Sequence, residues 1–292
     1  MLNTPASPSP TLNPDGTISA VVLSVSPPDA PFRLLRLWLP PGAAESPVCG
    51  RFWMARCAED TLSARAQDWS IYLRRPLLAA GVPETMARPQ EADPVPNEAG
   101  AGERIDLLLG PAADPGADWL AARPPGSTVN LLGPFGRPFA LPPNSRTLLV
   151  LTLPAYAPLW LPAVHDMLDR GGRVTLVTPP PAAAESLRAR LPLAVELRAA
   201  RDAADWSQHL AETVRWADHL CASLPASHYQ PLADDVRRTR FRVDPGFAHI
   251  YLEANLACGF GACLACAVPL PDGGMTRACL HGPIFPLERV TV

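Results

Sequence analysis

Four cysteines close to the carboxyl end constrain the fold of this chain more than any other feature of its sequence. The chain of 292 residues holds seven cysteines, and four of them, Cys258, Cys263, Cys266 and Cys279, lie within its last 35 residues. In a chain without a secretion signal, cysteines gathered in this way indicate metal or redox chemistry more often than a disulfide framework. This end of the chain is therefore expected to fold around a metal group.

The spacing of these cysteines predicts a 2Fe–2S cluster. Cys258, Cys263 and Cys266 follow the pattern C-x4-C-x2-C, and twelve residues separate Cys266 from Cys279. The same opening spacing is found in plant-type iron–sulfur loops. Three thiolates from one loop must wrap round a flat cluster, so the backbone has to approach inorganic sulfur closely. Small residues permit this approach, and here they are Gly259, Gly261, Ala262 and Ala265.

Two other interpretations of the cysteines stay open at this point. A structural zinc site more naturally shows two C-x2-C pairs with a longer spacer, and this part of the sequence has one such pair. Buried structural cysteines are the second alternative. The remaining three, Cys49, Cys57 and Cys221, stand apart among apolar residues and are interpreted as small buried hydrophobic side chains.

Charge and hydropathy exclude several functions. A formal net charge of −3 without a block of basic residues offers no electrostatic surface for nucleic acid. The 25 Lys and Arg residues are all Arg, so chemistry that needs a Schiff-base lysine or a P-loop lysine is excluded. Residues 1–17 lack the charged and apolar segments of a targeting signal, and no apolar run is long enough to span a membrane. We therefore expect a cytoplasmic protein with no membrane insertion and no nucleic-acid partner.

The pattern of apolar residues predicts two kinds of sheet. Short alternating runs separated by Pro and Gly favour an antiparallel barrel or sandwich: Ile18–Val25, Arg33–Leu39, Arg51–Cys57 and Ile105–Leu109. Strands then alternate with helices, which indicates a parallel, Rossmann-like sheet. The expected strands are Thr147–Thr152, Arg173–Val177 and Ala194–Arg198, and the expected helices are Ala157–Asp169, Ala182–Arg190 and Trp206–Leu220.

The cysteine segment resembles a known family. The stretch from Leu252 to Cys266, LEANLACGFGACLAC, and the stretch from Arg277 to Phe285, RACLHGPIF, closely resemble the electron transfer subunit of dihydroorotate dehydrogenase, an iron–sulfur flavoprotein of the ferredoxin reductase-like type. In that family the fourth cysteine is followed by x-Asp-Gly-Pro-Val-Phe. Here His281 stands for the aspartate, and it either donates a hydrogen bond near the cluster or faces solvent in a turn.

The resemblance implies three modules in a fixed order, which gives the fold class α/β plus all-β. We expect a flexible tail over residues 1–16, an antiparallel FAD-binding-type β-barrel over 17–140, a nucleotide-binding-like parallel α/β domain over 141–240 and a small 2Fe–2S domain over 241–292. The family likeness covers almost the whole chain.

The resemblance also implies a site for FAD on the barrel. Gly50–Met54 looks like the family's Gly-Gln-Phe strand, and Leu73–Leu78 looks like its Leu-Arg-Arg-Pro-Ile-Ser. By this likeness Arg75 meets the FAD phosphates, with a guanidinium fork that suits phosphate. The segment 114–120 resembles a Gly-x-Gly-Thr-x-x-Leu turn that offers N–H groups to the pyrophosphate. The FAD-binding residues implied are Arg75, Pro76, Leu77, Leu78, Gly116 and Ala117.

The nucleotide-binding turn of the family is changed in this chain. Leu132–Phe139 keeps the family's Leu-Gly-Pro-Leu-Gly-x-x-Phe, but the Gly-rich turn expected after the next strand reads Leu153-Pro154-Ala155-Tyr156. Such a turn needs open backbone N–H groups, and Pro154 removes one of them. Binding of NAD is therefore not expected.

Two functions follow as hypotheses. In the first, the chain is an electron-transfer subunit rather than a stand-alone enzyme. It relays electrons through the 2Fe–2S cluster, together with FAD, from an FMN-containing dihydroorotate dehydrogenase-type catalytic partner in pyrimidine biosynthesis. In the second, the chain is a cluster-only redox-sensing or regulatory subunit that has lost flavin and NAD binding.

Overall fold

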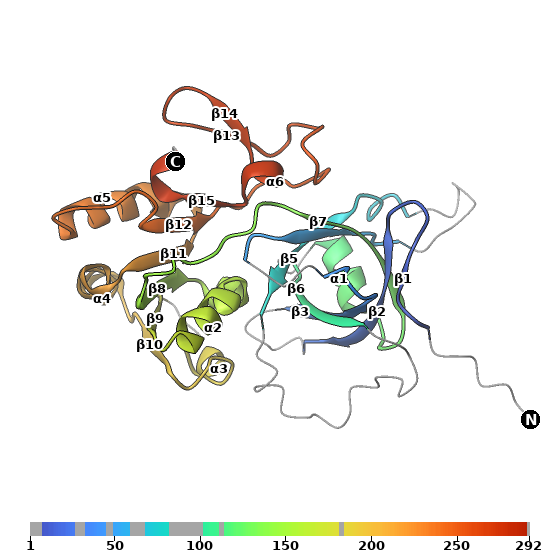
Figure 1. The fold of residues 1–292 in the computed structure, drawn as a ribbon, viewed down its shortest axis with the longest axis horizontal. Helices are drawn as coiled ribbons and strands as arrows, with labels where there is room; N and C mark the ends of the chain where they lie inside the picture. Colours follow the sequence, from blue (N-terminus) through green and yellow to red (C-terminus); the bar gives the residue numbers. More distant parts are fainter. Residues whose placement is uncertain are drawn as a thin grey trace, which may run out of the picture.

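The computed structural model describes residues 8–26, 33–44, 49–58, 68–81, 102–110, 114–180 and 184–290. They form a seven-stranded sheet, a six-stranded sheet and a two-stranded hairpin. Figure 1 shows the amino-terminal sheet in blue to green beside an α/β unit in green to orange, with the cysteine segment in red along the top of the view. This is the fold class that the sequence predicts.

The amino-terminal sheet closes into a barrel. Its strands are β1 (Thr11–Leu12), β2 (Ile18–Val25), β3 (Leu34–Leu39), β4 (Phe52–Ala55), β5 (Arg75–Ala80), β6 (Glu103–Leu108) and β7 (Thr128–Phe135). The order is β1-β2-β3-β6-β5-β4-β7, and β7 also pairs antiparallel with β2. Since a closed ring leaves no open strand edge, the six longer strands protect one another.

The interior of the barrel follows from the period-two pattern of its strands. Alternate residues of β3 are fully buried within it: Leu35, Leu37 and Leu39. The helix α1 (Pro115–Ala121) contributes Leu120 to the same cluster. Burial of these side chains supplies the main driving force for closing the sheet.

The second sheet has the Rossmann arrangement. Its strands are β8 (Thr147–Thr152), β9 (Arg173–Thr178), β10 (Val195–Ala199), β11 (His219–Ser223), β12 (Ala248–Tyr251) and β15 (Ile284–Pro286). The order is β10-β9-β8-β11-β12-β15. Neighbours are parallel except for β15, which runs antiparallel to β12. The chain order reverses between β8 and β11, the place where sheets of this kind form a ligand crevice.

Helices connect the parallel strands. They are the α-helices α2 (Leu161–Asp169), α3 (Ala184–Arg188), α4 (Ala203–Trp216) and α5 (Tyr229–Thr239) and the 3-10 helices η1 (Pro154–Trp160), η2 (Ala226–His228) and η3 (Leu287–Arg289). Asp202 caps α4 by accepting from the Asp205 N–H, as capping carboxylates commonly do. Over the described ranges, every helix is too short or too polar to traverse a bilayer.

Several elements differ from the sequence-based expectation. The helix expected over Trp206–Leu220 ends at Trp216, because Ala217 is extended with ψ 142°, and His219 begins strand β11. The helix expected over Ala157–Asp169 starts as η1, whose Pro158 interrupts regular α-helical hydrogen bonding. Strands β5, β7 and β11 and helix α5 were not among the predicted elements.

Two expected module boundaries also shift. In the tail expected over residues 1–16, β1 pairs Thr11 with Ser19 of β2, while residues 1–7 lie outside the described part. At the predicted boundary of residue 241, the α/β sheet is still incomplete, because β12 hydrogen-bonds to β11 and β15 returns to pair with β12. The cysteine segment is therefore an excursion between the last two strands of that sheet.

Candidate functional site

The cysteine segment leaves the sheet after β12 and returns at β15. Between them lie an irregular loop, the hairpin β13 (Ala267–Pro269) and β14 (Met275–Arg277), and the short helix α6 (Ala278–His281). In the hairpin Ala267 pairs with Arg277, and the Ala278 N–H donates to the Cys266 carbonyl at 2.9 Å. This pairing places Cys279 beside Cys266.

The structure brings the four predicted ligands together as two pairs. The Cys266 and Cys279 sulfurs lie 3.3 Å apart, and these residues are 2% and 1% exposed. Cys258 accepts a hydrogen bond from the Cys263 thiol, and this second pair is nearer the surface. The Gly261 N–H donates to the Cys279 sulfur, so one loop contacts both pairs.

Backbone donors favour the thiolate of Cys258. Burial raises the pKa of this thiol, but N–H groups of Cys263, Phe260 and Ala262 and the Cys263 side chain outweigh that effect and lower the pKa to about 6. The thiolate is the form that binds metals. At Cys279, burial and the adjacent Cys266 sulfur raise the pKa instead.

Glycines let the cysteine loop pack directly on the barrel. Gly259 and Gly261 have φ of 83° and 82°, values that glycine adopts without strain. A Cβ on Gly259 would come within 2.9 Å of the Phe135 ring and 3.0 Å of Met54. Leu264 has φ 59°, a strained value of the kind retained where surrounding structure fixes a functional loop.

The donor set fits a two-metal cluster better than a single ion. In the part of the chain that the structure describes, no three His, Cys, Asp or Glu side chains gather closely enough to hold one metal ion. A structural zinc site needs four donors around one point, whereas a 2Fe–2S cluster distributes four cysteines over two irons. Two separate cysteine pairs suit the second arrangement.

His281 makes its side-chain hydrogen bond to the hairpin. Its Nδ1 lies 2.9 Å from the Thr276 hydroxyl, and the side chain is exposed. Of the two interpretations that the sequence left open, the exposed side chain agrees with a solvent-facing residue, which lies at the end of α6 rather than in a turn.

Arg75, expected to bind phosphate, is engaged within the barrel. Its Nε donates to the two carboxylate oxygens of Asp114 at 2.9 and 2.7 Å. Asp114 also accepts from the Gly116 N–H at 3.1 Å, as the cap of α1. Arg75 and Gly116, both expected to meet the FAD phosphates, are thus joined through the Asp114 carboxylate. In this arrangement they do not fit a bound diphosphate.

The other residues predicted for FAD are largely buried. Leu77 is fully buried inside the barrel, and Leu78 is 8% exposed on the side that packs toward the α/β unit. Pro76, opposite Met54 in the sheet, is partly buried. Ala117 lies in the first turn of α1 and is 1% exposed.

The crevice between β8 and β11 is filled by the chain itself. At its base the Thr152 and Ser223 hydroxyls lie 2.6 Å apart, and Trp160 Nε1 donates to Ser223 at 3.0 Å. Trp160 and Thr152 have no exposed surface. η1 also accepts, at Pro158, a hydrogen bond from the Gly81 N–H of the barrel. The place where a nucleotide would be expected is occupied by side chains, so these residues do not fit NAD.

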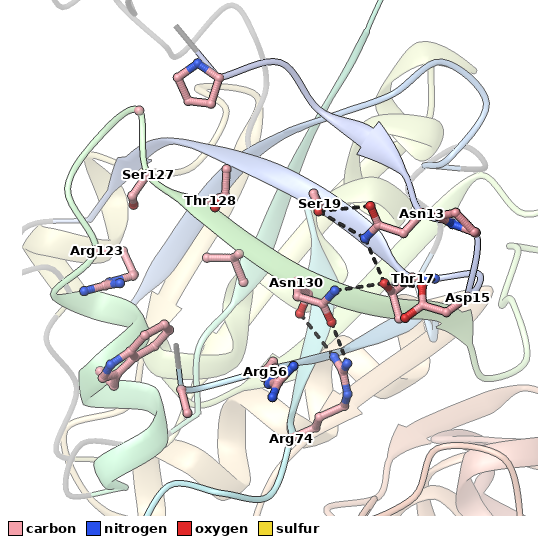
Figure 2. A pocket seen from close by; sticks show the side chains of 16 residues that line it. Asn13, Asp15, Thr17, Ser19, Arg56, Arg74, Arg123, Ser127, Thr128 and Asn130 are labelled. Carbon is pink, nitrogen blue, oxygen red and sulfur yellow. Dashed lines mark hydrogen bonds between the residues drawn. The ribbon is translucent and has the colours of Figure 1, made fainter. Parts of the chain in front are cut away.

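A cavity of about 970 Å³ lies on the outer face of the barrel, and no residue predicted for FAD lines it. Figure 2 shows Arg74 hydrogen-bonded to Asn130, which in turn donates to Thr17. Arg74 and Arg75, adjacent in sequence, therefore serve opposite faces of the sheet. Sequence reasoning missed this cavity. The sequence pattern that could have indicated it is the alternation of polar residues at the starts of β2 and β7: Thr17 and Ser19, and Thr128 and Asn130.

Sequence comparisons agree with the geometry of the cysteine segment. Residues 253–291 match the family model described as the iron-sulfur cluster binding domain of dihydroorotate dehydrogenase B. The chain is 30% identical over 192 residues to the electron transfer subunit of dihydroorotate dehydrogenase B (NAD(+)) from Desulforamulus reducens, covering 60% of this chain and 70% of that protein. The corresponding subunit from Geobacillus kaustophilus is 32% identical over 184 residues, 58% of this chain and 68% of that one.

A third relative matches over a short stretch of the chain. The homolog of this electron transfer subunit from Aquifex aeolicus is 49% identical over 39 residues, 13% of this chain. That match spans 16% of the Aquifex protein, well under two thirds of its length.

Solved structures confirm the ferredoxin reductase-like fold. The structure titled as an NADH-dependent reduced ferredoxin-NADP oxidoreductase superposes with a TM-score of 0.62 at 18% identity, covering 93% of this chain and 89% of that one. The ferredoxin reductase in carbazole 1,9a-dioxygenase gives 0.52 at 15% identity, covering 80% and 66%. With the Desulforamulus and Geobacillus matches, these findings place the chain in the family of dihydroorotate dehydrogenase B electron transfer subunits.

Proposed function

We propose that this chain holds a 2Fe–2S cluster on Cys258, Cys263, Cys266 and Cys279 and relays electrons for a dihydroorotate dehydrogenase-type assembly. The observation that carries the proposal is the arrangement of these cysteines as two pairs on one loop, within the segment that matches the iron–sulfur family model. The two pairs correspond to the two irons of such a cluster.

A bound 2Fe–2S cluster accepts and releases one electron at a time. The chain provides it with two different surroundings, because the Cys266–Cys279 pair is buried and the Cys258–Cys263 pair is near the surface. N–H groups directed at Cys258 stabilise negative charge on that sulfur. The surface pair is therefore the side at which an electron is exchanged with another protein.

Exposed apolar side chains on the cysteine segment support a protein partner. Four large ones are strongly exposed on the cysteine segment: Phe260 at 57%, Leu264 at 57%, Leu280 at 40% and Met275 at 64%. We call these residues the apolar collar. Several exposed apolar side chains on one segment favour protein contacts. Given the names of the relatives, the proposed partner is an FMN-containing dihydroorotate dehydrogenase-type catalytic subunit, in pyrimidine biosynthesis in the cytoplasm.

A specific observation favours the alternative function as well. The Asp114 carboxylate bridges the expected phosphate ligands, and Trp160 with Ser223 fills the nucleotide crevice. Both arrangements are consistent with a cluster-only redox-sensing or regulatory subunit that has lost flavin and NAD binding. FAD remains a prediction from resemblance and enters no step of the proposed relay.

Analysis of anaerobically purified protein tests both functions. Under the relay proposal we expect two irons and two sulfides per chain, no zinc, and a rhombic electron paramagnetic resonance signal after reduction with dithionite. Mixing the reduced protein with an oxidised catalytic partner should abolish that signal, because the cluster is reoxidised. Iron-free or zinc-loaded protein would contradict the cluster assignment. A cluster that exchanges no electron with the partner would favour the regulatory alternative.

A further inference from the structure

We infer that the Asp114 carboxylate competes with the diphosphate of FAD for the same barrel groups and thereby sets the flavin affinity of this chain. The turn over residues 114–117 stands where the resembling family has Gly-x-Gly-Thr, so Asp114 replaces its first glycine. The inference concerns the flavin site alone and holds whether or not the proposed electron partner is correct.

Asp114 engages both groups that the resemblance assigns to phosphate. Its oxygens accept from Arg75 Nε at 2.7 and 2.9 Å, and one of them accepts from the Gly116 N–H at 3.1 Å. A guanidinium edge together with a backbone N–H is a donor set that suits a phosphate oxygen equally well. The carboxylate therefore acts as an anion built into the chain at this position.

Packing holds the Arg75 guanidinium in place beside the carboxylate. Arg75 Nη1 donates to the Leu73 carbonyl at 2.6 Å, which fixes the guanidinium from its other end. The Arg75 side chain lies against Gly116, where a Cβ would come within 2.8 Å of its Nε. The two charged side chains are 21% and 27% exposed. A diphosphate that used the Arg75 Nε and the Gly116 N–H as donors would have to displace Asp114 from both.

The charge of Asp114, like its position, disfavours binding of the diphosphate. Burial raises the pKa of this carboxyl group, but the Arg75 guanidinium and the Gly116 N–H outweigh burial and hold the pKa below its usual range. The group is therefore ionised at neutral pH, and an approaching diphosphate meets a like charge. Like charges placed together in an interface disfavour binding strongly.

Flavin binding to two Asp114 variants tests the inference. Asp114→Gly restores the residue of the resembling turn, and Asp114→Asn removes the charge while keeping a side chain that can cap α1. Asp118→Asn is the matched control, because Asp118 lies on the same helix and pairs with Arg33 at 2.9 Å. Dissociation constants are measured on the cluster-loaded protein by quenching of flavin fluorescence, with FAD and with riboflavin, which has no phosphate.

We expect the Asp114 variants to gain affinity for FAD but not for riboflavin. Asp114→Gly should bind FAD on the order of tenfold more tightly than the unmodified chain, with Asp114→Asn in between and Asp118→Asn unchanged. Riboflavin affinity should be the same for all four proteins. Equal FAD affinity across the series, or an equal gain for riboflavin, would overturn the inference. Thermal melts and iron content on the same samples separate this outcome from loss of the fold or of the cluster.

Discussion

The sulfur atoms of Cys266 and Cys279 lie 3.3 Å apart although a hairpin of the chain separates them. The register of that hairpin is responsible: Val268 pairs with Thr276 and is itself buried, and the Ala278 N–H returns to the Cys266 carbonyl. The fourth cysteine is thus positioned by backbone pairing rather than by its distance along the sequence.

Replacing Cys279 should remove the cluster. Cys279→Ala deletes one of four proposed thiolate ligands, in a buried position. We expect iron content and visible absorbance to fall to background in anaerobically purified protein. Cys221→Ala is the control, since that thiol is equally buried in the α/β core. Full iron content in Cys279→Ala would show that another group completes the site.

Contact between the cysteine loop and the barrel should matter for cluster retention. Gly259→Ala adds a Cβ that meets Phe135 and Met54 at 2.9 and 3.0 Å, so the loop must shift. Overpacking of this kind costs about 1–3 kcal/mol in addition to the strain of a positive φ. We expect a lower melting temperature and faster loss of iron to a chelator.

Gly273→Ala separates these two costs. Gly273 has φ 81°, similar to the 83° of Gly259, but nothing lies within 4 Å of its added Cβ. The Ala variant there should show the backbone strain alone. If the two variants lose iron at the same rate, contact with the barrel does not hold the loop in place.

The sequence predicted the elements whose signal is local. Strand β8 begins and ends at the predicted residues, Thr147 and Thr152. An uninterrupted apolar run between polar ends is typical of a buried strand in a parallel sheet. The four cysteines could likewise be proposed as ligands from their spacing, but their division into two pairs could not. The start of β11 was assigned to the predicted helix Trp206–Leu220, since its residues continue an apolar pattern and no proline or glycine marks the break.

The arrangement at Asp114 could not be read from the sequence. Asp114 lies 39 residues from Arg75, and their contact depends on α1 closing one end of the barrel. The filling of the crevice by Trp160 similarly depends on where η1 packs. Pro154 and Tyr156 indicated that the turn had changed, but not that a buried hydrogen bond to Ser223 would replace it.

Acid should destabilise the fold through His219. Its ring stacks on His249 at 5.1 Å and on Phe139 at 5.7 Å, and burial together with His249 lowers its pKa to about 3. In the unfolded chain the ring takes up a proton near pH 6.5. The unfolded state therefore binds more protons between these values, and stability decreases as the pH falls, by up to about 1.4 kcal/mol per unit.

His219→Phe should weaken this pH dependence. The variant keeps an aromatic ring against Phe139 but carries no titratable group. Free energies of unfolding in urea, followed by circular dichroism at pH 7.5 and 5.0, should differ less than in the unmodified chain. His228→Gln, at an exposed position, should behave like the unmodified chain. An unchanged pH dependence in His219→Phe would assign the effect to other groups, including His249, whose pKa burial also lowers.

The filled crevice should contribute to stability. Ser223→Ala leaves the buried Trp160 Nε1 and Thr152 hydroxyl without their shared partner. An unsatisfied buried polar group costs about 1–3 kcal/mol, and we expect a loss in this range from chemical denaturation. Ser227→Ala, on the exposed 3-10 helix η2, should cost far less. If Ser223→Ala leaves the free energy of unfolding unchanged, these hydrogen bonds do not hold η1 in the crevice.

The apolar collar should govern binding of the catalytic partner. Phe260 and Leu264 flank Cys263 in sequence and are each 57% exposed, so a charge placed there must be buried, unpaired, in the proposed interface. Phe260→Asp should weaken binding about tenfold or more, measured by calorimetry with the purified catalytic subunit. Leu193→Asp is the control, since Leu193 is 94% exposed on the α/β unit, ahead of β10. Iron content should be unchanged in both. Because the cluster is then intact, equal partner affinity for the two variants would place the docking surface away from the cysteines and would require electrons to leave by another face.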